Sequence, residues 1–248
     1  MKKKDKIRLD ILLAQQGLVL SRKRAAALIM AGKVMVDNGC CDKPGTKISP
    51  ESVISLKEKD HPFVSRGGLK LEKALKTLAF DVTDLVCLDI GASTGGFTDC
   101  LLQNGAQKVY AVDVGYGQMA WKLRQDNRVK LIERTNIRYM AFEAVNEQVD
   151  LVTIDTSFIS LKTVIPAAEK FMRNKTRILA LVKPQFEAGK AHVGKGGVVH
   201  DPEIRQGVLA DIKDFFKQKG YGAGDVVPSP VPGPKGNREF IISLIYNM

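Results

Sequence analysis

The stretch from Val86 to Thr98 constrains the fold more than any other part of the sequence. It begins with V-C-L-D-I, which is apolar apart from Asp89 and is typical of a short buried strand. The small or hydroxylated residues G-A-S-T-G-G follow, and an amphipathic helical pattern starts at Phe97. A buried strand that leads through a glycine-rich turn into a helix is typical of the nucleotide-binding corner of a doubly wound sheet. Glycine suits this turn because it adopts the required dihedral angles without strain and lets a ligand approach bare backbone.

The pattern after residue 65 supplies the context that this turn needs, because an ordinary strand-to-helix turn has a similar local sequence. Apolar runs predict further strands at 108–112, 129–132, 151–154, 178–182, 226–227 and 240–245. Amphipathic runs predict one helix that ends at residue 78 and four others, at 97–103, 119–124, 161–172 and 201–219. This alternation predicts an α/β fold, a doubly wound, Rossmann-like sheet with helices on both faces.

The charge of the chain indicates a polyanionic partner. With 38 Lys and Arg against 27 Asp and Glu, the 248-residue chain carries a formal net charge of +11. The first 60 residues hold 13 basic and 7 acidic residues, so about half of the excess lies in a quarter of the length. Such clustering is typical of nucleic-acid binding, although a solvated basic surface gives the same count.

Cysteine usage and hydropathy favour a cytoplasmic protein. The four cysteines, Cys40, Cys41, Cys87 and Cys100, form no C-x-x-C pair, so the sequence predicts neither a metal site nor a disulfide framework. Polar residues at 15–17 interrupt the apolar stretch after the basic N-terminus, which argues against a signal peptide. The sequence holds no apolar run near the roughly 18 residues that a membrane-spanning helix requires, so no membrane partner is expected.

The first 60 residues predict two short helices followed by short strands. Ser21 is a candidate N-cap for the second helix, and strands are expected at 34–36 and 53–56. Arg22, Lys23 and Arg24 occupy the first turn of that helix, where the helix dipole disfavours positive charge. This placement indicates that they face a partner that supplies phosphates, with chance placement on a solvated turn as the alternative.

Four segments of this region form a recognisable pattern: R-L-D-I-L-L, G-L-V-L-S-R-K-R-A, G-K-V-M-V-D and the turn K-P-G. Together they resemble the RNA-binding domain named after ribosomal protein S-four. The resemblance implies a small α+β RNA-binding domain over residues 1–59. A charged, proline-ended linker at 60–64 and a second domain at 65–248 would follow. The residues expected to face RNA are Arg8, Ser21, Arg22, Lys23, Arg24, Lys43 and Arg66.

The glycine spacing at the corner separates two classes of cofactor. Gly91 is followed by three residues and then by Gly95 and Gly96, which departs from the G-x-G-x-x-G pattern of dinucleotide enzymes. This spacing suits the first motif of S-adenosylmethionine-dependent methyltransferases, which bind no pyrophosphate. Asp113 ends the next predicted strand and is placed to accept hydrogen bonds from a ribose, with a solvated strand-end carboxylate as the alternative.

The ends of other strands predict the reaction. Three predicted strands end in Asp89, Asp155 and Lys183, and the carboxyl ends of strands converge on one crevice in such a sheet. Lys70 precedes the first of these strands and Glu239 begins the last strand. Lys, Asp, Lys and Glu beside a methyl donor fit deprotonation of a ribose 2′-hydroxyl. A lysine with an ordinary pKa of about 10.4 is a poor base, but a second lysine nearby and a dry pocket would lower that pKa.

Six motifs occur in a recognisable order: S-R-G-G-L-K-L, L-D-I-G-A-S-T-G-G-F-T-D, Y-A-V-D-V-G, D-T-S-F-I-S-L, V-K-P-Q-F-E and G-N-R-E-F. They resemble the TlyA, or hemolysin A-like, family, whose second domain is similar to FtsJ-type ribose methyltransferases. One departure is Thr156, where the family pattern has valine. The resemblance implies a catalytic tetrad of Lys70, Asp155, Lys183 and Glu239. It implies an S-adenosylmethionine pocket formed by Asp89, Gly91, Ser93, Thr94, Gly95, Gly96, Phe97 and Asp113.

The family acts on cytidine 2′-hydroxyls of small- and large-subunit ribosomal RNA, so the resemblance implies ribosomal RNA in ribosomal subunits as the partner. Three alternatives remain open on the sequence. They are a membrane-active hemolysin, which the family name suggests, an RNA-binding protein with an inactive methyltransferase fold, and a dinucleotide enzyme.

Overall fold

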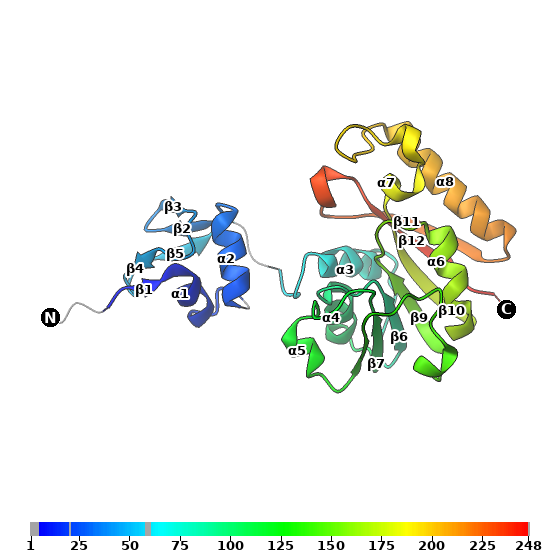
Figure 1. Cartoon of the computed structure of the whole chain (residues 1–248), viewed down its shortest axis with the longest axis horizontal. Helices are drawn as coiled ribbons and strands as arrows, with labels where there is room; N and C mark the ends of the chain where they lie inside the picture. The colour runs from blue at the N-terminus through cyan, green and yellow to red at the C-terminus, as the bar shows by residue number, and fades with distance from the viewer. Residues whose placement is uncertain (1–4, 20, 58–60, 248) are drawn as a thin grey trace. The chain divides into compact units, whose positions relative to one another are not determined.

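The computed structural model describes residues 5–19, 21–57 and 61–247, and the chain forms two compact units, Met1–Pro62 and Phe63–Met248 (Figure 1). Residue 60, the first of the predicted linker at 60–64, lies outside the described residues. So do residues 1–4, 20, 58 and 59 of the predicted first domain. Phe63 is buried in the core of the second unit, and the Val64 amide donates to the Asp99 carboxylate there. The second unit therefore begins at Phe63.

The first unit packs two helices against short antiparallel strands. The helices are α1 (Leu9–Gln15) and α2 (Arg22–Met30). The strands are β1 (Ile7–Arg8), β2 (Val34–Val36), β3 (Gly39–Cys41), β4 (Lys47–Ile48) and β5 (Ile54–Leu56), which pair as a β3-β2-β5 sheet and a β1-β4 ribbon. The predicted cap at Ser21 is confirmed, because its side chain accepts from the Arg24 amide at 3.2 Å. Strands β1, β3 and β4 escaped prediction because each is only two or three residues long and, unlike V-M-V of β2, holds no run of strand-forming apolar residues.

The second unit is built on one seven-stranded sheet in the order β11-β12-β10-β9-β6-β7-β8. Its strands are β6 (Val86–Ile90), β7 (Lys108–Val112), β8 (Val129–Ile132), β9 (Val149–Ile154), β10 (Met172–Val182), β11 (Gly222–Pro228) and β12 (Phe240–Ile245). Neighbouring strands from β10 to β8 are parallel, while β12 pairs antiparallel with both β10 and β11. The predicted doubly wound α/β sheet is confirmed.

Helices cover both faces of this sheet, as Figure 1 shows. The helices are α3 (Gly67–Thr77), α4 (Gly96–Gln103), α5 (Trp121–Arg124), α6 (Leu161–Ala168), α7 (Pro184–Glu187) and α8 (Pro202–Gln218), with 3₁₀ turns at 142–144, 169–171, 190–192 and 234–236. Leu71, Leu101 and Leu123 from α3, α4 and α5 pack on one face of the sheet. Ile165 and Phe216 from α6 and α8 pack on the other. Alternate residues of each strand thus enter separate cores.

Strand β10 starts six residues earlier than its apolar run predicted. Met172 pairs with Val149, and the register then shifts so that Arg177 pairs with Leu151. The intervening residues are polar, and all but Thr176 are exposed, which hides this part of the strand from a hydropathy pattern. The predicted helix at 161–172 consequently ends at Ala168, and a single 3₁₀ turn leads into β10.

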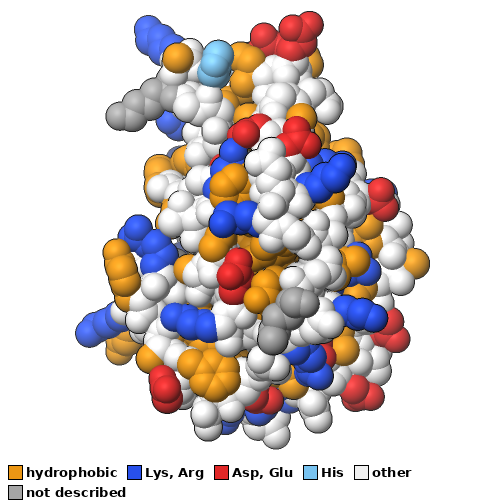
Figure 2. Space-filling model, turned by 90° about the vertical axis from the view of Figure 1, so that its right-hand side faces the viewer, with side chains coloured by type: hydrophobic (Ala, Val, Ile, Leu, Met, Phe, Trp, Pro, Cys, Tyr) orange, Lys and Arg blue, Asp and Glu red, His pale blue; other side chains and the backbone are white. Residues whose placement is uncertain are grey.

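The surface beyond this sheet mixes charges of both signs. On the face that Figure 2 shows, Lys and Arg side chains are interspersed with Asp and Glu, and apolar side chains form small patches. None of the helices in the described part of the chain is long and apolar enough to cross a membrane.

Candidate active site

The site lies where the strand order reverses direction. The chain runs outward from β6 through β7 to β8 on one side, and from β9 to β10 on the other, so a crevice opens between the ends of β6 and β9. Gly91 follows β6 with φ +83°, and a Cβ atom there would lie 2.8 Å from the backbone oxygen of Asp155. Only glycine fits this approach. Gly91 therefore lets the turn and the Asp155 segment meet.

Two further glycines stand at positions of the turn that have no room for a side chain. A Cβ atom on Gly95, which has φ +97°, would lie 2.3 Å from a methyl group of Leu123. A Cβ atom on Gly96 would lie 2.2 Å from Oγ of Ser65. Helix α4 starts at Gly96, so its first backbone amides adjoin this glycine-rich turn. Such a cradle suits a ligand that approaches the backbone closely.

The Asp89 side chain links β6 to α4 and β9 through hydrogen bonds. The predicted strand V-C-L-D-I is confirmed as β6, which ends at Ile90, so Asp89 does not stand at the strand end as predicted. Its side chain points to the opposite side of the sheet from those of its two neighbours. The carboxylate is fully buried and accepts from Thr98 Oγ1 at 2.6 Å and Thr153 Oγ1 at 3.0 Å. The structure does not bring Asp89 into the lining of either of the two cavities at this edge of the sheet.

Burial raises the pKa of Asp89 to about 6, although the hydrogen bonds from Thr98 and Thr153 oppose the shift. Because the folded-state pKa lies above that of the unfolded chain, the carboxylate costs stability as the pH rises from about 4 to about 6. We expect D89N to remove this cost, which is about 3 kcal/mol at most. Urea unfolding of both proteins at pH 4, 5, 6 and 7 checks it. A difference between the two free energies of unfolding that is constant with pH would contradict the assignment.

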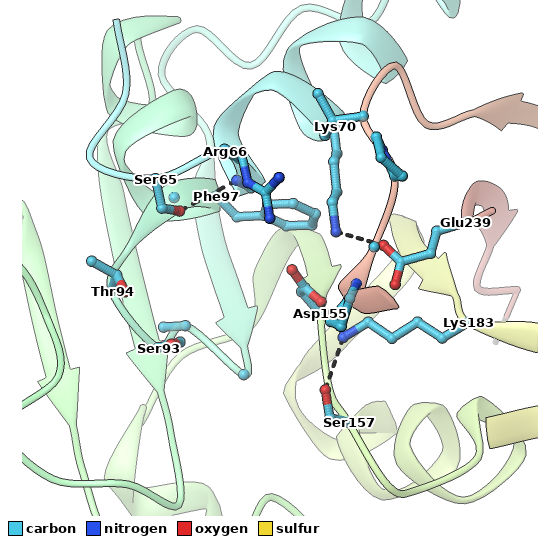
Figure 3. Close-up of a pocket in the computed structure, with 18 residues that line it drawn as sticks. Ser65, Arg66, Lys70, Ser93, Thr94, Phe97, Asp155, Ser157, Lys183 and Glu239 are labelled. Atoms are coloured by element: carbon cyan, nitrogen blue, oxygen red, sulfur yellow. Dashed lines mark hydrogen bonds and ion pairs between the residues drawn. The ribbon is translucent and has the colours of Figure 1, made fainter. Parts of the chain in front are cut away.

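A cavity of about 320 Å³ brings the four predicted catalytic residues together (Figure 3). Lys70 comes from α3, Asp155 and Lys183 follow β9 and β10, and Glu239 precedes β12. Lys70 Nζ lies 2.6 Å from Glu239 Oε2, and Lys183 Nζ lies 2.5 Å from Asp155 Oδ1 and 3.0 Å from Ser157 Oγ. Lys70, Lys183 and Glu239 are buried, while Asp155 is partly exposed. Two largely buried ion pairs therefore line one cavity.

The second carboxylate oxygen of Glu239 has no hydrogen-bond partner among the described residues. This oxygen, Oε1, is buried. It lies against the backbone of Gly233, where a Cβ atom would come within 2.1 Å of it. A buried acceptor left open in this way can accept a hydrogen bond from a ligand.

Asn237 holds the loop that forms this wall, and the sequence analysis missed it. Its side chain accepts from the Val199 amide at 3.1 Å and donates to the carbonyl groups of Gly197 and Pro234 at 2.9 and 3.2 Å. It is almost fully buried. Asparagine thus ties the glycine-rich loop before α8 to the Pro-Gly-Pro turn beside Glu239. The only sequence signal was its place in G-N-R-E-F.

A second cavity, of about 490 Å³, adjoins the first and shares Gly91, Ser93, Asp155 and Ser157 with it. Asp113 lines it, and its carboxylate accepts from the amides of Ser93 and Gly115, both at 2.7 Å. Its remaining lining, which the sequence analysis missed, is mostly apolar and includes Asn136, Ile137, Phe158, Ile159 and Val164. The segment T-N-I-R, which begins three residues after the last residue of β8, was a usable signal because it follows the carboxyl end of a strand.

The other predicted cofactor residues surround the first cavity. Ser93, Thr94, Gly96 and Phe97 line it, whereas Gly95 shapes the turn without lining either cavity. In the described part of the chain, no three or more His, Cys, Asp or Glu side chains are arranged to hold a metal ion.

Most residues predicted to face RNA lie in the first unit. Arg8 and Arg22 both pair with Asp10, Arg24 contacts His61 at 2.8 Å, and Lys23 and Lys43 are exposed. The hydroxyl of Ser21 is used by the helix cap. Arg66 lies in the second unit, where it is exposed and lines the 320 Å³ cavity.

Comparison with known proteins agrees with this two-part organisation. The FtsJ-like methyltransferase family matches residues 63–246, and the S4 domain matches residues 7–54. The 16S/23S rRNA (cytidine-2′-O)-methyltransferase TlyA of Mycobacterium tuberculosis is 47% identical over 238 residues, which cover 96% of this chain and 89% of the relative. Hemolysin A of Brachyspira hyodysenteriae is 40% identical over 96% of this chain and the whole of the relative.

A solved structure from Streptococcus thermophilus that carries the hemolysin name is also similar. It has 43% identity and a TM-score of 0.78, and the match covers 98% of this chain and 89% of that chain. With a methyltransferase family over residues 63–246 and relatives this similar over almost the full length, the resemblance predicted from the motifs is confirmed. The chain belongs to the TlyA, or hemolysin A-like, family, with an S4 domain followed by an FtsJ-like methyltransferase domain.

Proposed function

We propose that this enzyme transfers a methyl group from S-adenosylmethionine to the 2′-hydroxyl of cytidine in ribosomal RNA, within ribosomal subunits in the cytoplasm. The observation that carries the proposal is the presence of two ion pairs, Lys70–Glu239 and Lys183–Asp155, in the 320 Å³ cavity, beside a second cavity that Asp155 also lines. The relative from Mycobacterium tuberculosis bears the name of this activity and supports the choice of substrate.

The larger cavity fits the adenosine part of the cofactor. Asp113 would accept from the ribose hydroxyls at the end of β7, while apolar residues such as Ile137 and Val164 would contact the base. The glycine-rich turn from Gly91 to Gly96 would hold the methionine part, and Phe97 and Thr94 line the adjoining wall. When bound, S-adenosylmethionine supplies an electrophilic methyl group.

The protein's own part in the reaction is to position the ribose and to manage one proton. Lys183 lies between Asp155 and Ser157, so its ammonium group is oriented toward the shared wall (Figure 3). After losing a proton, its nitrogen would accept the proton of the 2′-hydroxyl, and in the ammonium form it would stabilise the negative oxygen. Lys70 and Glu239 add one charge of each sign to the same cavity. In-line placement of oxygen and methyl group supplies much of the remaining rate enhancement.

Transfer of tritiated methyl from S-adenosylmethionine to purified ribosomal subunits that lack the modification tests the proposal. We expect label in ribosomal RNA, located at cytidine 2′-oxygens by nuclease digestion and mass spectrometry. Small and large subunits are assayed separately, so that the experiment assigns the target. Absence of transfer to both subunits and to the extracted RNA would overturn the proposal. Lysis of red cells by the same pure, detergent-free protein would favour a hemolysin instead.

A further inference from the structure

The predicted RNA-binding face of the first unit is organised around one acidic side chain. Asp10 is the second residue of α1, and its side chain is only 3% exposed. Arg8 donates to it through Nε and Nη2, at 3.0 and 2.9 Å, in a bidentate pair. Arg22, from the start of α2, donates to the same carboxylate through Nε at 2.9 Å. A single carboxylate therefore joins two arginines that lie 14 positions apart in the sequence.

The arginines themselves remain at the surface. Their side chains are 42% and 58% exposed for Arg8 and Arg22, in contrast with the buried Asp10. The bonds to Asp10 use one edge of each guanidinium, which leaves Nη1 of Arg8 and both terminal nitrogens of Arg22 without a hydrogen bond to the described residues. Planar donors of this kind match the geometry of a phosphate group.

The position of the carboxylate is also fixed. The Asp10 amide donates to the Pro44 carbonyl and the neighbouring Leu9 amide to the Thr46 carbonyl, so the turn that contains Lys43 lies against the start of α1. Gly45 in that turn lies close to the guanidinium of Arg8, since a Cβ atom there would be 3.1 Å from Nη1. The Arg8 guanidinium lowers the pKa of Asp10 to about 2, so the carboxylate stays charged at neutral pH.

An acidic group between two arginines is unfavourable for RNA binding by charge alone, since it cancels one of two positive charges. We propose that Asp10 is a positioning residue that holds Arg8 and Arg22 side by side, so that their outer N–H groups bind the phosphate backbone of the RNA. This inference rests on the proposed function for the identity of the partner. Ordering two flexible side chains before binding removes an entropy cost that the complex would otherwise bear.

The change D10N separates positioning from charge, because it makes the first unit more positive and removes the acceptor that both arginines share. Charge alone predicts tighter binding to RNA. Positioning predicts weaker binding, by about three- to tenfold, as the guanidinium groups become mobile. The matched control is D42N, which removes the same charge from an exposed residue in the same unit and should leave affinity unchanged or raise it.

The measurement is the affinity of full-length protein for purified ribosomal subunits at several salt concentrations. Weaker binding by D10N and not by D42N supports the inference, and equal or tighter binding by D10N overturns it. If D10N lowers the melting temperature of the protein, R22K decides the question, because it keeps the charge of an exposed residue and loses the planar fork. R22K binding as well as the original chain would overturn the inference.

The binding assay distinguishes failure of this inference from failure of the proposed function. Methyl transfer that continues while D10N binds normally would overturn only the role of Asp10. Subunit binding that depends on Asp10 in a protein without methyl transfer would overturn only the proposed reaction.

Discussion

We expect K183A to lower the rate of methyl transfer by roughly 10²- to 10⁴-fold, which is the range for loss of a general base or acid. The physical reason is that Lys183 Nζ lies 2.5 Å from Asp155 and 3.0 Å from Ser157 at the wall shared by the two cavities. Its removal takes away the group that handles the proton and leaves the Asp155 carboxylate without its cation. Single-turnover kinetics with tritiated cofactor measure this step, and equilibrium dialysis should show cofactor affinity changed by about twofold or less.

Two further variants sharpen that test. K183R keeps the positive charge and cannot readily give up a proton, so it should be nearly as slow as K183A if Lys183 accepts the proton. If Lys183 only stabilises charge, K183R should recover much of the rate. K162A is the matched control, because Lys162 pairs with Asp211 on helices that cover one face of the sheet. Full activity in K183A would show that the assigned mechanism is wrong.

Removal of residues 1–62 should weaken binding to ribosomal subunits by roughly 10²-fold at physiological salt, because the deleted unit carries most of the side chains predicted to bind phosphate. The plot of log affinity against log salt concentration should become shallower by about 0.9 for each phosphate group that the shortened chain no longer neutralises. The shortened chain begins at Phe63, because the Phe63 ring packs against Gly68. A Cβ atom on Gly68 would lie 2.3 Å from that ring. Cutting later would open the core of the second unit.

Cofactor affinity is the control for this truncation. The shortened chain keeps Ser65, Arg66 and Gly67, which line the 320 Å³ cavity, and keeps the whole glycine turn. Titration with S-adenosylmethionine should therefore give nearly the same dissociation constant for both proteins. Equal affinity for subunits at every salt concentration, with and without residues 1–62, would remove the RNA-binding role of the first unit.

Local sequence was sufficient where one segment carries its own signals. Strands β7, β8 and β12 begin and end where their apolar runs do, and α8 starts at the predicted Asp201–Pro202 cap. The corner at Gly91 was predictable because a buried strand, a glycine-rich turn and a helix follow one another without a break. Such elements can be predicted from the sequence because buried residues recur along a helix or a strand with the period of its backbone.

Contacts between distant segments could not be predicted in the same way. Lys70 and Glu239 are 169 residues apart, and only the antiparallel placement of β12 beside β10 brings the glutamate to the crevice. Asp89 and Asp155 both stand near strand ends in the sequence. Asp89 faces the core because β6 continues past it to Ile90, whereas Asp155 follows its strand and faces the cavity.

The sequence by itself determined the doubly wound fold and the glycine corner, and strand-end convergence placed Asp155 and Lys183 near that corner. Lys70 and Glu239 joined them as a set of four through the family motifs. Only the tertiary structure decided how those four pair, that Asn237 holds their wall and that Asp10 joins Arg8 to Arg22. The physical reason is that hydrogen bonds and ion pairs act over about 3 Å between side chains, whereas the sequence records only their order along the backbone.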